Sequence, residues 1–304
     1  MFQAPPIIHF EVFASLPDRF RRVDGSAPWL KVQKRNAPSD SFLEGPSFDR
    51  DGNLYVTDIP YGRIFKIAPD ASVELVVEYD GEPNGLKFHR DGRAFIADHK
   101  NGILALDVTD GTLETICDRP KLERFRGVND LFFASNGDLY FTDQGQSGLQ
   151  DPSGRLYRLD RSGRLECVLD GIPSPNGVLL SPDEDSVLVS VTRANQVWRA
   201  PLLLDGGTSK VGAFLQLSGG FGPDGMAMDV DGNLAVSHPG LGSVWLFSPQ
   251  GEPILRIASK TGKVVTNCAF GGPDRRWLYA TEADTGLVLQ AELDTPGLEM
   301  FGLS

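Results

Sequence analysis

The stretch LEGPSFDRDGNLYVTD, residues 43–58, joins a short apolar segment to an Asp-Gly turn and an alternating strand. Asp-Gly and Asn-Gly favour tight hairpin turns because both central positions tolerate positive φ. The segment after the turn, NLYVTD, alternates apolar and polar side chains with the period of a strand. Ahead of the turn stands Glu44, a charged residue that leads a segment, GPSF, otherwise typical of packed interior.

The same phrase recurs along the chain at intervals of 40 to 48 residues. After residue 51 it starts again at residues 91, 136, 183, 231 and 274, as DGRAFIAD, NGDLYFTD, DEDSVLVS, DGNLAVSH and DRRWLYAT. A repeat of this length is typical of propeller blades and helical arrays, and the strand periodicity favours the propeller. The first unit holds four strand-like segments: PSFD, NLYVTD, GRIFKIAP and VELVVEYD. The sequence therefore predicts an all-β, six-bladed β-propeller with four-stranded blades.

We expect a single domain over residues 1–304, with the six repeats in residues 43–304. The last repeat lacks an obvious fourth strand, whereas the segment IIHFEVFASL, residues 7–16, alternates and has no partner of its own. This N-terminal strand is predicted to close the ring by pairing with the last blade. Residues 17–42 connect it to the first blade, either as a surface crossover or as a lid in which Trp29 makes an apolar contact.

The composition excludes several classes of function. A net charge of -12 and a pI near 4.8 argue against nucleic-acid binding, which requires a basic surface. No apolar run approaches the roughly 18 residues of a membrane span, and the N-terminus lacks signal-peptide features. Cys117, Cys167 and Cys268 form no CxxC pair. We expect a cytoplasmic protein with reduced thiols and no membrane partner, in an oligomeric state that the sequence leaves open.

Six polar residues stand seven positions ahead of the six turns. All are carboxylates or carboxamides: Glu44, Asn84, Asn129, Asn176, Asp224 and Asn267. The first strand of each propeller blade lies nearest the axis, and these strands run in one direction, so the six side chains should form a ring at one end of the central channel. Turn chemistry explains a single Asn-Gly or Asp-Gly. It does not explain Glu44, nor Asn129 and Asn267, which no glycine follows.

The chemistry of this ring predicts a cation site. Buried polar groups clustered on an axis are costly unless they bind something. Two carboxylates and several amide oxygens, without Lys or Arg, suit a hard divalent cation. The ring has no His or Cys, which argues against a structural zinc site. Glu44 is therefore predicted to point at a metal ion.

With this ring in place, the sequence resembles the senescence marker protein/gluconolactonase/luciferin-regenerating enzyme family, from about Glu11 to Leu303. The most specific segments are LEGPSFDRDGNLYVTD, RGVNDLFFASNGDLYFTD, SPNGVLLSPDEDSVLVS and GPDGMAMDVDGNLAVS. The resemblance implies one divalent cation in the channel, most often calcium and otherwise zinc, manganese or magnesium, with Glu44, Asn176 and Asp224 as ligands. It also implies that Asn129 binds substrate or completes the metal shell.

The resemblance points to a metal-dependent lactonase acting on a small lactone. The cation would polarise the lactone carbonyl and stabilise the oxyanion, and Asp224, with Asn129, is the catalytic candidate because it can accept a proton from water. Asp130 is expected to orient Asn129 or to bind a second ion. The substrate-binding candidates are Asn84, Arg126, Asn267 and Asp130, and the loops 117–127 and 145–155 are expected to shape the specificity pocket.

Two alternatives remain open at this stage. Diisopropyl-fluorophosphatase propellers resemble this chain in carrying a similar ligand set, so the ring alone does not separate lactone from organophosphate hydrolysis. A non-catalytic propeller that binds a ligand on its face is the other alternative, and the charges of Glu44 and Asp224 argue against it. Sugar-specific members of the family often carry an Arg where this chain has Gly127, with Arg126 and Arg124 close by.

Overall fold

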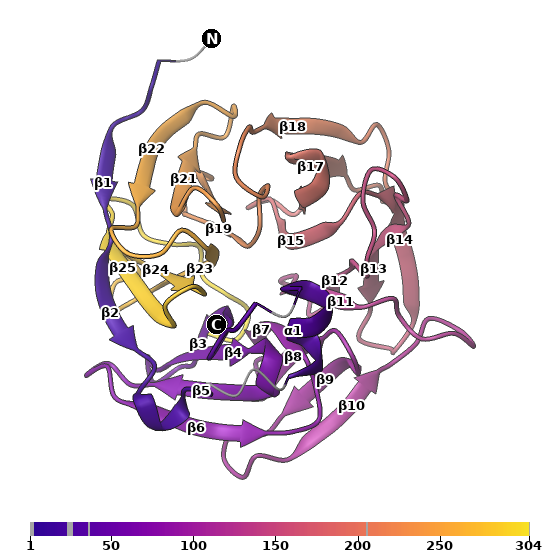
Figure 1. Cartoon of the computed structure of the whole chain (residues 1–304). Coiled ribbons are helices and arrows are strands. Elements are labelled where there is room, and N and C mark those ends of the chain that lie inside the picture. Colours follow the sequence, from indigo (N-terminus) through magenta and orange to yellow (C-terminus); the bar gives the residue numbers. More distant parts are fainter. Residues whose placement is uncertain (1–2, 23–26, 36, 205, 304) are drawn as a thin grey trace.

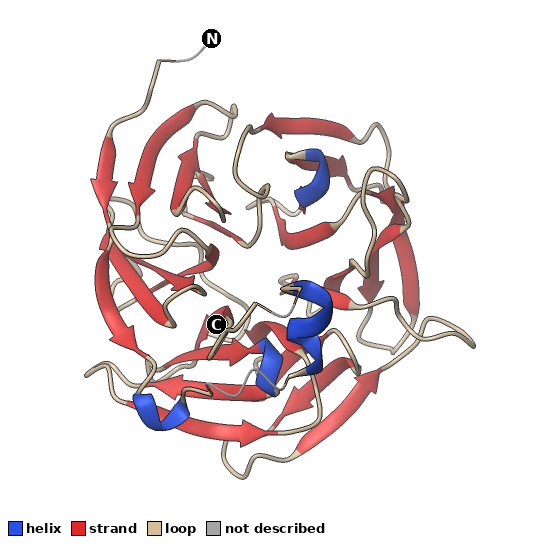
Figure 2. Cartoon of the chain, viewed as in Figure 1, coloured by secondary structure: helices blue, strands red, loops and turns tan. Residues whose placement is uncertain are grey.

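The computed structural model describes residues 3–22, 27–35, 37–204 and 206–303. Six sheets are arranged around a central axis, as Figures 1 and 2 show, and this confirms the predicted six-bladed propeller. Within each sheet the strands of one repeat are antiparallel and follow one another in chain order from the axis outward, and N-terminal strands are added outside blades five and six. The strand that leads each sequence repeat is therefore the innermost one.

The strands of the six blades have the following bounds. Blade one holds β3 (Leu43–Phe48), β4 (Leu54–Asp58), β5 (Arg63–Ile67) and β6 (Val73–Glu78). Blade two holds β7 (Pro83–Phe88), β8 (Ala94–Asp98), β9 (Gly102–Leu106) and β10 (Leu113–Cys117). Blade three holds β11 (Val128–Phe133), β12 (Leu139–Asp143), β13 (Gly154–Leu159) and β14 (Leu165–Ile172). Blade four holds β15 (Pro175–Leu180), β16 (Ser186–Val191), β17 (Gln196–Pro201) and β18 (Gly212–Gln216). Blade five holds β19 (Met226–Met228), β20 (Leu234–His238), β21 (Ser243–Phe247) and β22 (Pro253–Ala258), and blade six holds β23 (Val265–Gly271), β24 (Trp277–Glu282) and β25 (Leu287–Glu292).

The N-terminal segment closes the ring, but as two strands rather than one. The second, β2 (Glu11–Ser15), pairs antiparallel with β25 and supplies the outer strand of blade six, as predicted. The first, β1 (Ile7–His9), pairs parallel with β22 and adds a fifth strand to blade five. Between them Phe10, only 3% exposed, packs in a core cluster shared by these two blades. The buried Phe10 side chain divides the predicted strand 7–16 into two strands, and its packing fastens blade five to blade six.

Acidic side chains at the end of the second strand of a blade position the residue that precedes the inner strand. In four blades such a carboxylate accepts the backbone N–H of the residue just before the inner strand. The pairs are Phe42 to Asp58 at 2.7 Å, Glu82 to Asp98 at 3.0 Å, Gly127 to Asp143 at 2.8 Å and Val264 to Glu282 at 3.2 Å. Each carboxylate therefore satisfies a donor that the sheet leaves unpaired, and it positions the residues that follow on the channel side.

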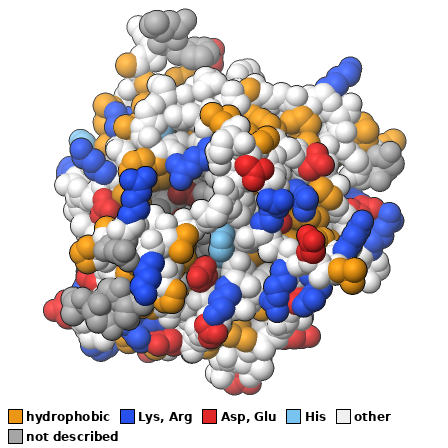
Figure 3. All heavy atoms as spheres, turned by 45° about the vertical axis from the view of Figure 1, so that its right-hand side comes forward, with side chains coloured by type: hydrophobic (Ala, Val, Ile, Leu, Met, Phe, Trp, Pro, Cys, Tyr) orange, Lys and Arg blue, Asp and Glu red, His pale blue; other side chains and the backbone are white. Residues whose placement is uncertain are grey.

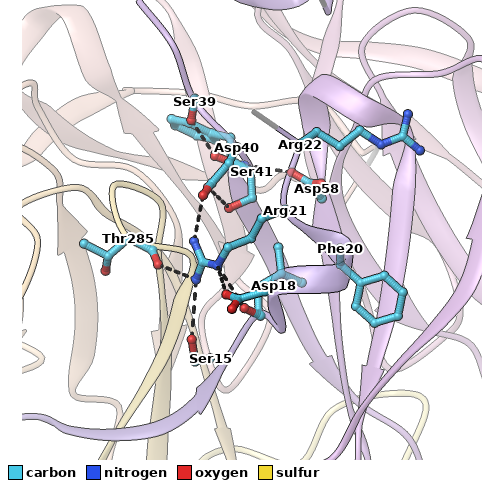
Figure 4. Close-up of polar contacts among 12 residues, drawn as sticks. Ser15, Asp18, Phe20, Arg21, Arg22, Ser39, Asp40, Ser41, Asp58 and Thr285 are labelled. Atoms are coloured by element: carbon cyan, nitrogen blue, oxygen red, sulfur yellow. Dashed lines mark hydrogen bonds and ion pairs between the residues drawn. The ribbon is translucent and has the colours of Figure 1, made fainter. Parts of the chain in front are cut away.

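Arg21 ties the N-terminal connection to the closing blade (Figure 4). Its guanidinium donates to the Leu16 carbonyl at 3.0 Å, to Asp40 at 3.0 Å and to the Thr285 carbonyl at 2.9 Å. These partners belong to the end of the closing strand, the segment before β3 and the β24–β25 turn, which are far apart in sequence. The partly buried Arg21 guanidinium thus holds the N-terminal segment against blade six and against the start of blade one.

We expect Arg21→Ala to lower the free energy of unfolding by about 1–3 kcal/mol, because the substitution leaves several partners of a charged group without a donor. Arg22→Ala is the matched control, since the exposed Arg22 side chain forms an ion pair with Glu78 and lies over the Tyr61 ring, both within the first blade's surroundings. Exposed ion pairs contribute about 0–1 kcal/mol. Urea denaturation of both variants measures the difference, and equal losses would contradict a role for Arg21 in closure.

The two ends of the channel differ in chemistry. At the C-terminal ends of the inner strands, Phe48, Met228 and Phe270 line an enclosed cavity together with Leu298 and Met300 of the C-terminal segment. Figure 1 shows the C-terminus near the axis. The chain's own tail therefore covers this apolar end, and the polar ring lies at the other end of the same strands.

Within the described part of the chain, none of the helices has the length and apolarity needed to cross a membrane. On the face shown in Figure 3, basic and acidic side chains are interspersed among each other. This face therefore carries both signs of charge, although the chain as a whole is acidic.

Candidate metal and substrate site

The inner strands place the six polar residues at one level of the channel. Glu44, Asn84, Asn129 and Asn176 are each the second residue of an inner strand, whereas Asn267 is the third residue of β23 and Asp224 stands two residues before β19. In five blades the register shifts directly after this point. Such β-bulges re-aim side chains and are common beside functional sites.

Close approach between neighbouring blades explains the glycines that follow the polar residues. A Cβ on Gly45 would lie 2.2 Å from the carbonyl oxygen of Asn84, and one on Gly177 would lie 2.5 Å from that of Asp224. Likewise, a Cβ on Gly85 would lie 2.3 Å from Asp130 Oδ1, and one on Gly225 would lie 2.0 Å from the Asn267 side chain. The Asn84-Gly85 and Asn176-Gly177 pairs lie inside strands and not in turns. Glycine is required here because the inner strands converge.

Glu44 and Asp224 form the acidic part of the site. Glu44 is 3% exposed, and burial, followed by the charges of Asp224 and Asp130, raises its pKa well above the ordinary range. Burial and the charge of Asp130 raise the pKa of Asp224 to about 8, against a hydrogen bond from Asn176 that lowers it. The three carboxylates are therefore close enough to oppose one another's ionisation. A cation between them would remove this repulsion.

Asp130 and Asn267 brace the inner side of the ring. The Asn267 side chain hydrogen-bonds both Glu44 and Asp130, and its Oδ1 accepts the Cys268 N–H at 2.8 Å. Burial raises the pKa of Asp130, while the nearby ammonium of Lys87 lowers it. Lys87 itself is 8% exposed. This buried lysine, which the offset pattern missed, balances part of the negative charge below the ring.

Asn129 presents a buried oxygen that has no protein partner. Its Nδ2 donates to Gln144 Oε1 at 3.0 Å, and Gln144 Nε2 donates in turn to Ser174 Oγ at 3.0 Å. Within the described part of the chain, Asn129 Oδ1 is buried and makes no hydrogen bond. An unpaired carbonyl-type oxygen in the same ring as two carboxylates is the kind of ligand that a hard cation takes. The orienting contact of Asn129 in this structure is with Gln144.

The donor set fits a hard divalent cation better than a soft one. It consists of the carboxylates of Glu44 and Asp224 with the amides of Asn129 and Asn176. Among the residues that the structure describes, no group of three or more His, Cys, Asp or Glu side chains is arranged to hold a metal ion. The amide oxygens are therefore needed to complete the site, as they are for calcium.

We expect Gln144→Leu to weaken cation binding about 10- to 100-fold, the usual effect of removing a group that orients a metal ligand. The substitution frees the Asn129 amide to rotate. Gln216→Leu is the matched control, because Gln216 makes a similar amide–amide hydrogen bond with Gln196 at 2.7 Å on the outer edge of blade four. Calorimetric titration with Ca²⁺ measures both variants, and an unchanged affinity in Gln144→Leu would show that Gln144 does not orient Asn129.

A polar pocket adjoins the ring. It has a volume of about 370 Å³ and is lined by residues 144–150, Ser174, Arg193 and Gln33. Gln33 ends helix α1 (Pro28–Gln33), whose Leu30 packs in a cluster with Ala27 and Tyr61. The first half of the predicted specificity loop 145–155 thus lines a pocket, and the predicted crossover 17–42 reaches its edge through α1. The part of that crossover at residues 23–26 and 36 lies outside the described residues.

The remaining predicted substrate contacts lie around this arrangement. Asn84 is partly exposed at the level of the ring. Arg126 donates to Ser153 Oγ at 2.7 Å and lies 3.8 Å from Asp151, so it fastens the loop 145–155. A side chain at Gly127 has no room, because its Cβ would lie 2.2 Å from the His99 ring. The roles of Asn84 and Arg126 in substrate binding stay predictions.

Gln144 and Arg193 are residues of the site that the pattern of polar residues ahead of the turns does not include. Gln144 directly follows β12, and Arg193 lies in the 3-10 helix η3 (Thr192–Ala194) directly after β16. Both stand just beyond the end of a second strand, at the rim where the inner strands begin. A search of the residues after each repeated strand, and not only before each turn, would have found them.

The fold and the ring define a six-bladed propeller with an acidic, amide-rich site at one end of its channel. The chain belongs to the family described as the SMP-30/Gluconolactonase/LRE-like region, whose profile matches residues 42–284.

Curated relatives and solved structures agree with this assignment. The chain is 34% identical over 261 residues to a gluconolactonase of Zymomonas mobilis, covering 75% of this chain and 72% of the relative. It is 35% identical over 242 residues to the lactonase drp35 of Staphylococcus aureus, covering 76% and 72%. The fold matches regucalcin, a calcium-binding protein of Agrobacterium tumefaciens, with a TM-score of 0.78, 21% identity and 98% of each chain covered. A luciferin-regenerating enzyme matches with a TM-score of 0.77, 19% identity and coverage of 93% and 98%.

Proposed function

We propose that this protein is a divalent-metal-dependent lactonase, a carboxylic ester hydrolase that opens a small lactone with water. The observation that carries the proposal is the ring that holds two carboxylates, Glu44 and Asp224, which oppose each other's ionisation, together with the unpaired Asn129 Oδ1. The relatives named gluconolactonase and lactonase support the reaction class. They favour lactones over phosphotriesters as the substrate.

Glu44, Asn129, Asn176 and Asp224 would hold one divalent cation, with calcium first and zinc, manganese or magnesium as alternatives. When bound, the cation would supply Lewis-acid polarisation of the lactone carbonyl. The oxygen-only donor set supports calcium. Asn267 and Asn176 contribute by holding Glu44 and Asp224 in place through their amide groups.

Asp224 is the residue that we assign to proton transfer. Its carboxylate lies half-buried in the channel wall, and in the metal-free site burial and the charge of Asp130 raise its pKa to about 8. A bound cation would hold Asp224 ionised, so that its carboxylate could accept a proton from water. Asn176 hydrogen-bonds this carboxylate and so orients it. Asn129 would contact the reacting carbonyl group from blade three, with blade four between it and Asp224.

The test is a pH-indicator hydrolysis screen of sugar, aliphatic and aromatic lactones on chelator-stripped protein, with Ca²⁺, Mg²⁺, Mn²⁺ or Zn²⁺ added back singly. We expect acid release from one lactone class that depends on the added metal. A fluorophosphate is assayed in parallel. Turnover of the fluorophosphate alone, or no turnover by folded protein with any metal, would overturn the proposal in favour of organophosphate hydrolysis or a binding scaffold.

A further inference from the structure

Among the described residues that line the polar pocket, Arg193 is the single charged one. The other polar lining groups are amides and hydroxyls, including Gln33, Gln144, Ser147 and Ser174. The Arg193 side chain is exposed, and within the described part of the chain no carboxylate pairs with it at 4 Å or less. In a protein with a net charge of -12, a guanidinium at the mouth of a pocket that makes no ion pair with the described carboxylates is available to a ligand.

The backbone fixes Arg193 beside the ring. Thr192 Oγ1 donates to the Pro223 carbonyl at 2.8 Å, and a Cβ on Gly222 would lie 2.0 Å from the Thr192 carbonyl oxygen. Helix η3 is therefore packed directly on the segment that carries Asp224. The charge of Arg193 reaches Asp224, whose pKa it lowers. One end of a small ligand can lie on Arg193 while its other end lies at the ring.

We propose that Arg193 and the amide-rich pocket select a polyhydroxylated lactone that also carries a carboxylate. This inference rests on the proposed lactonase function and names its substrate class. A guanidinium binds a carboxylate through two parallel hydrogen bonds, and glutamine and serine side chains offer both donors and acceptors to hydroxyl groups. The carboxylate lies on Arg193, the hydroxyls lie along the pocket, and the ester group is presented to the ring.

The test compares two lactones that differ at one position. D-galactaro-1,4-lactone carries a carboxylate where D-galactono-1,4-lactone carries a hydroxymethyl group. We expect the protein with added Ca²⁺ to show the higher kcat/KM on the carboxylate lactone. In Arg193→Gln the ratio of the two kcat/KM values should fall about 10- to 100-fold, the range for a lost hydrogen bond between charged partners. Arg193→Lys, which keeps the charge without the paired geometry, should recover part of the ratio.

Arg164→Gln is the matched control, because Arg164 is exposed and pairs with Glu166 at the outer edge of blade three; its ratio should equal that of the unmodified protein. Binding of galactarate, measured by calorimetry, should weaken in Arg193→Gln and not in Arg164→Gln. A preference for the neutral lactone, or equal losses on both lactones in Arg193→Gln, would overturn this inference while leaving the lactonase function in place. Failure to hydrolyse any lactone would overturn both.

Discussion

Glu44→Gln is expected to lower divalent-cation affinity and metal-dependent lactone hydrolysis by at least about 1000-fold while the propeller stays folded, because it removes one of two charged ligands of a hard cation. The physical basis is the position of Glu44, buried between Asn267 and the charges of Asp224 and Asp130. A neutral amide of the same shape keeps the packing. It also relieves the repulsion among the carboxylates.

The metal-free stability separates a functional role of Glu44 from a structural one. Without a cation, Glu44→Gln should unfold at the same temperature as the unmodified protein or at a higher one, since a buried like-charge contact is gone. The unmodified protein should gain stability when Ca²⁺ is added, because a ligand that binds only the folded state stabilises it. Glu44→Gln should lose this gain. Differential scanning calorimetry with and without Ca²⁺ measures both quantities.

Glu282→Gln provides the opposite control. Glu282 is fully buried as well, but it accepts the backbone N–H groups of Val264, Asp284 and Thr285. Its substitution should lower the unfolding temperature and leave cation affinity unchanged. If Glu44→Gln instead behaved like Glu282→Gln, with lower metal-free stability and normal cation binding, Glu44 would be a structural residue and the site assignment would fail.

The repeat made the fold predictable from the sequence. A tight turn and an alternating strand recur six times, and strand pairing between neighbours in sequence leaves few other arrangements. The ring was predictable for the same reason, since a constant offset from the turn means a constant height along an inner strand. Both inferences depend on local pattern alone.

The parts that escaped prediction depend on contacts between blades. Burial of Phe10 between blades five and six divides the closing strand in a way that alternation cannot signal. The glycines after the ring residues have no explanation in the sequence pattern, because they reflect contact with the next blade. Gln144 and Arg193 lie just after the second strands of their blades, outside the repeated phrase itself. Gln144 has its role because the fold places it against Asn129, and Arg193 because the fold places it at the polar pocket.

The metal-free protein is expected to lose stability as pH rises from about 4 to about 8. The folded-state pKa of Asp224 is about 8, whereas an exposed aspartate titrates near 4. In this window the folded chain holds a proton that the unfolded chain has released, so the free energy of unfolding falls with rising pH by up to about 1.4 kcal/mol per unit for this one group. Asp224→Asn should remove this component, which urea denaturation of both proteins across the window measures.

Cation binding should show the opposite dependence on pH, since the cation requires the ionised carboxylate and competes with the proton. For a group with a pKa of about 8, the affinity should fall about 50-fold between pH 8 and pH 6. The raised pKa of Glu44 acts in the same direction. Calorimetry in buffers of different ionisation enthalpy should therefore detect proton release on Ca²⁺ binding at pH 6 to 7. An affinity independent of pH over this range would mean that neither carboxylate is protonated in the metal-free site, and so that the two are not buried against each other as the ring requires.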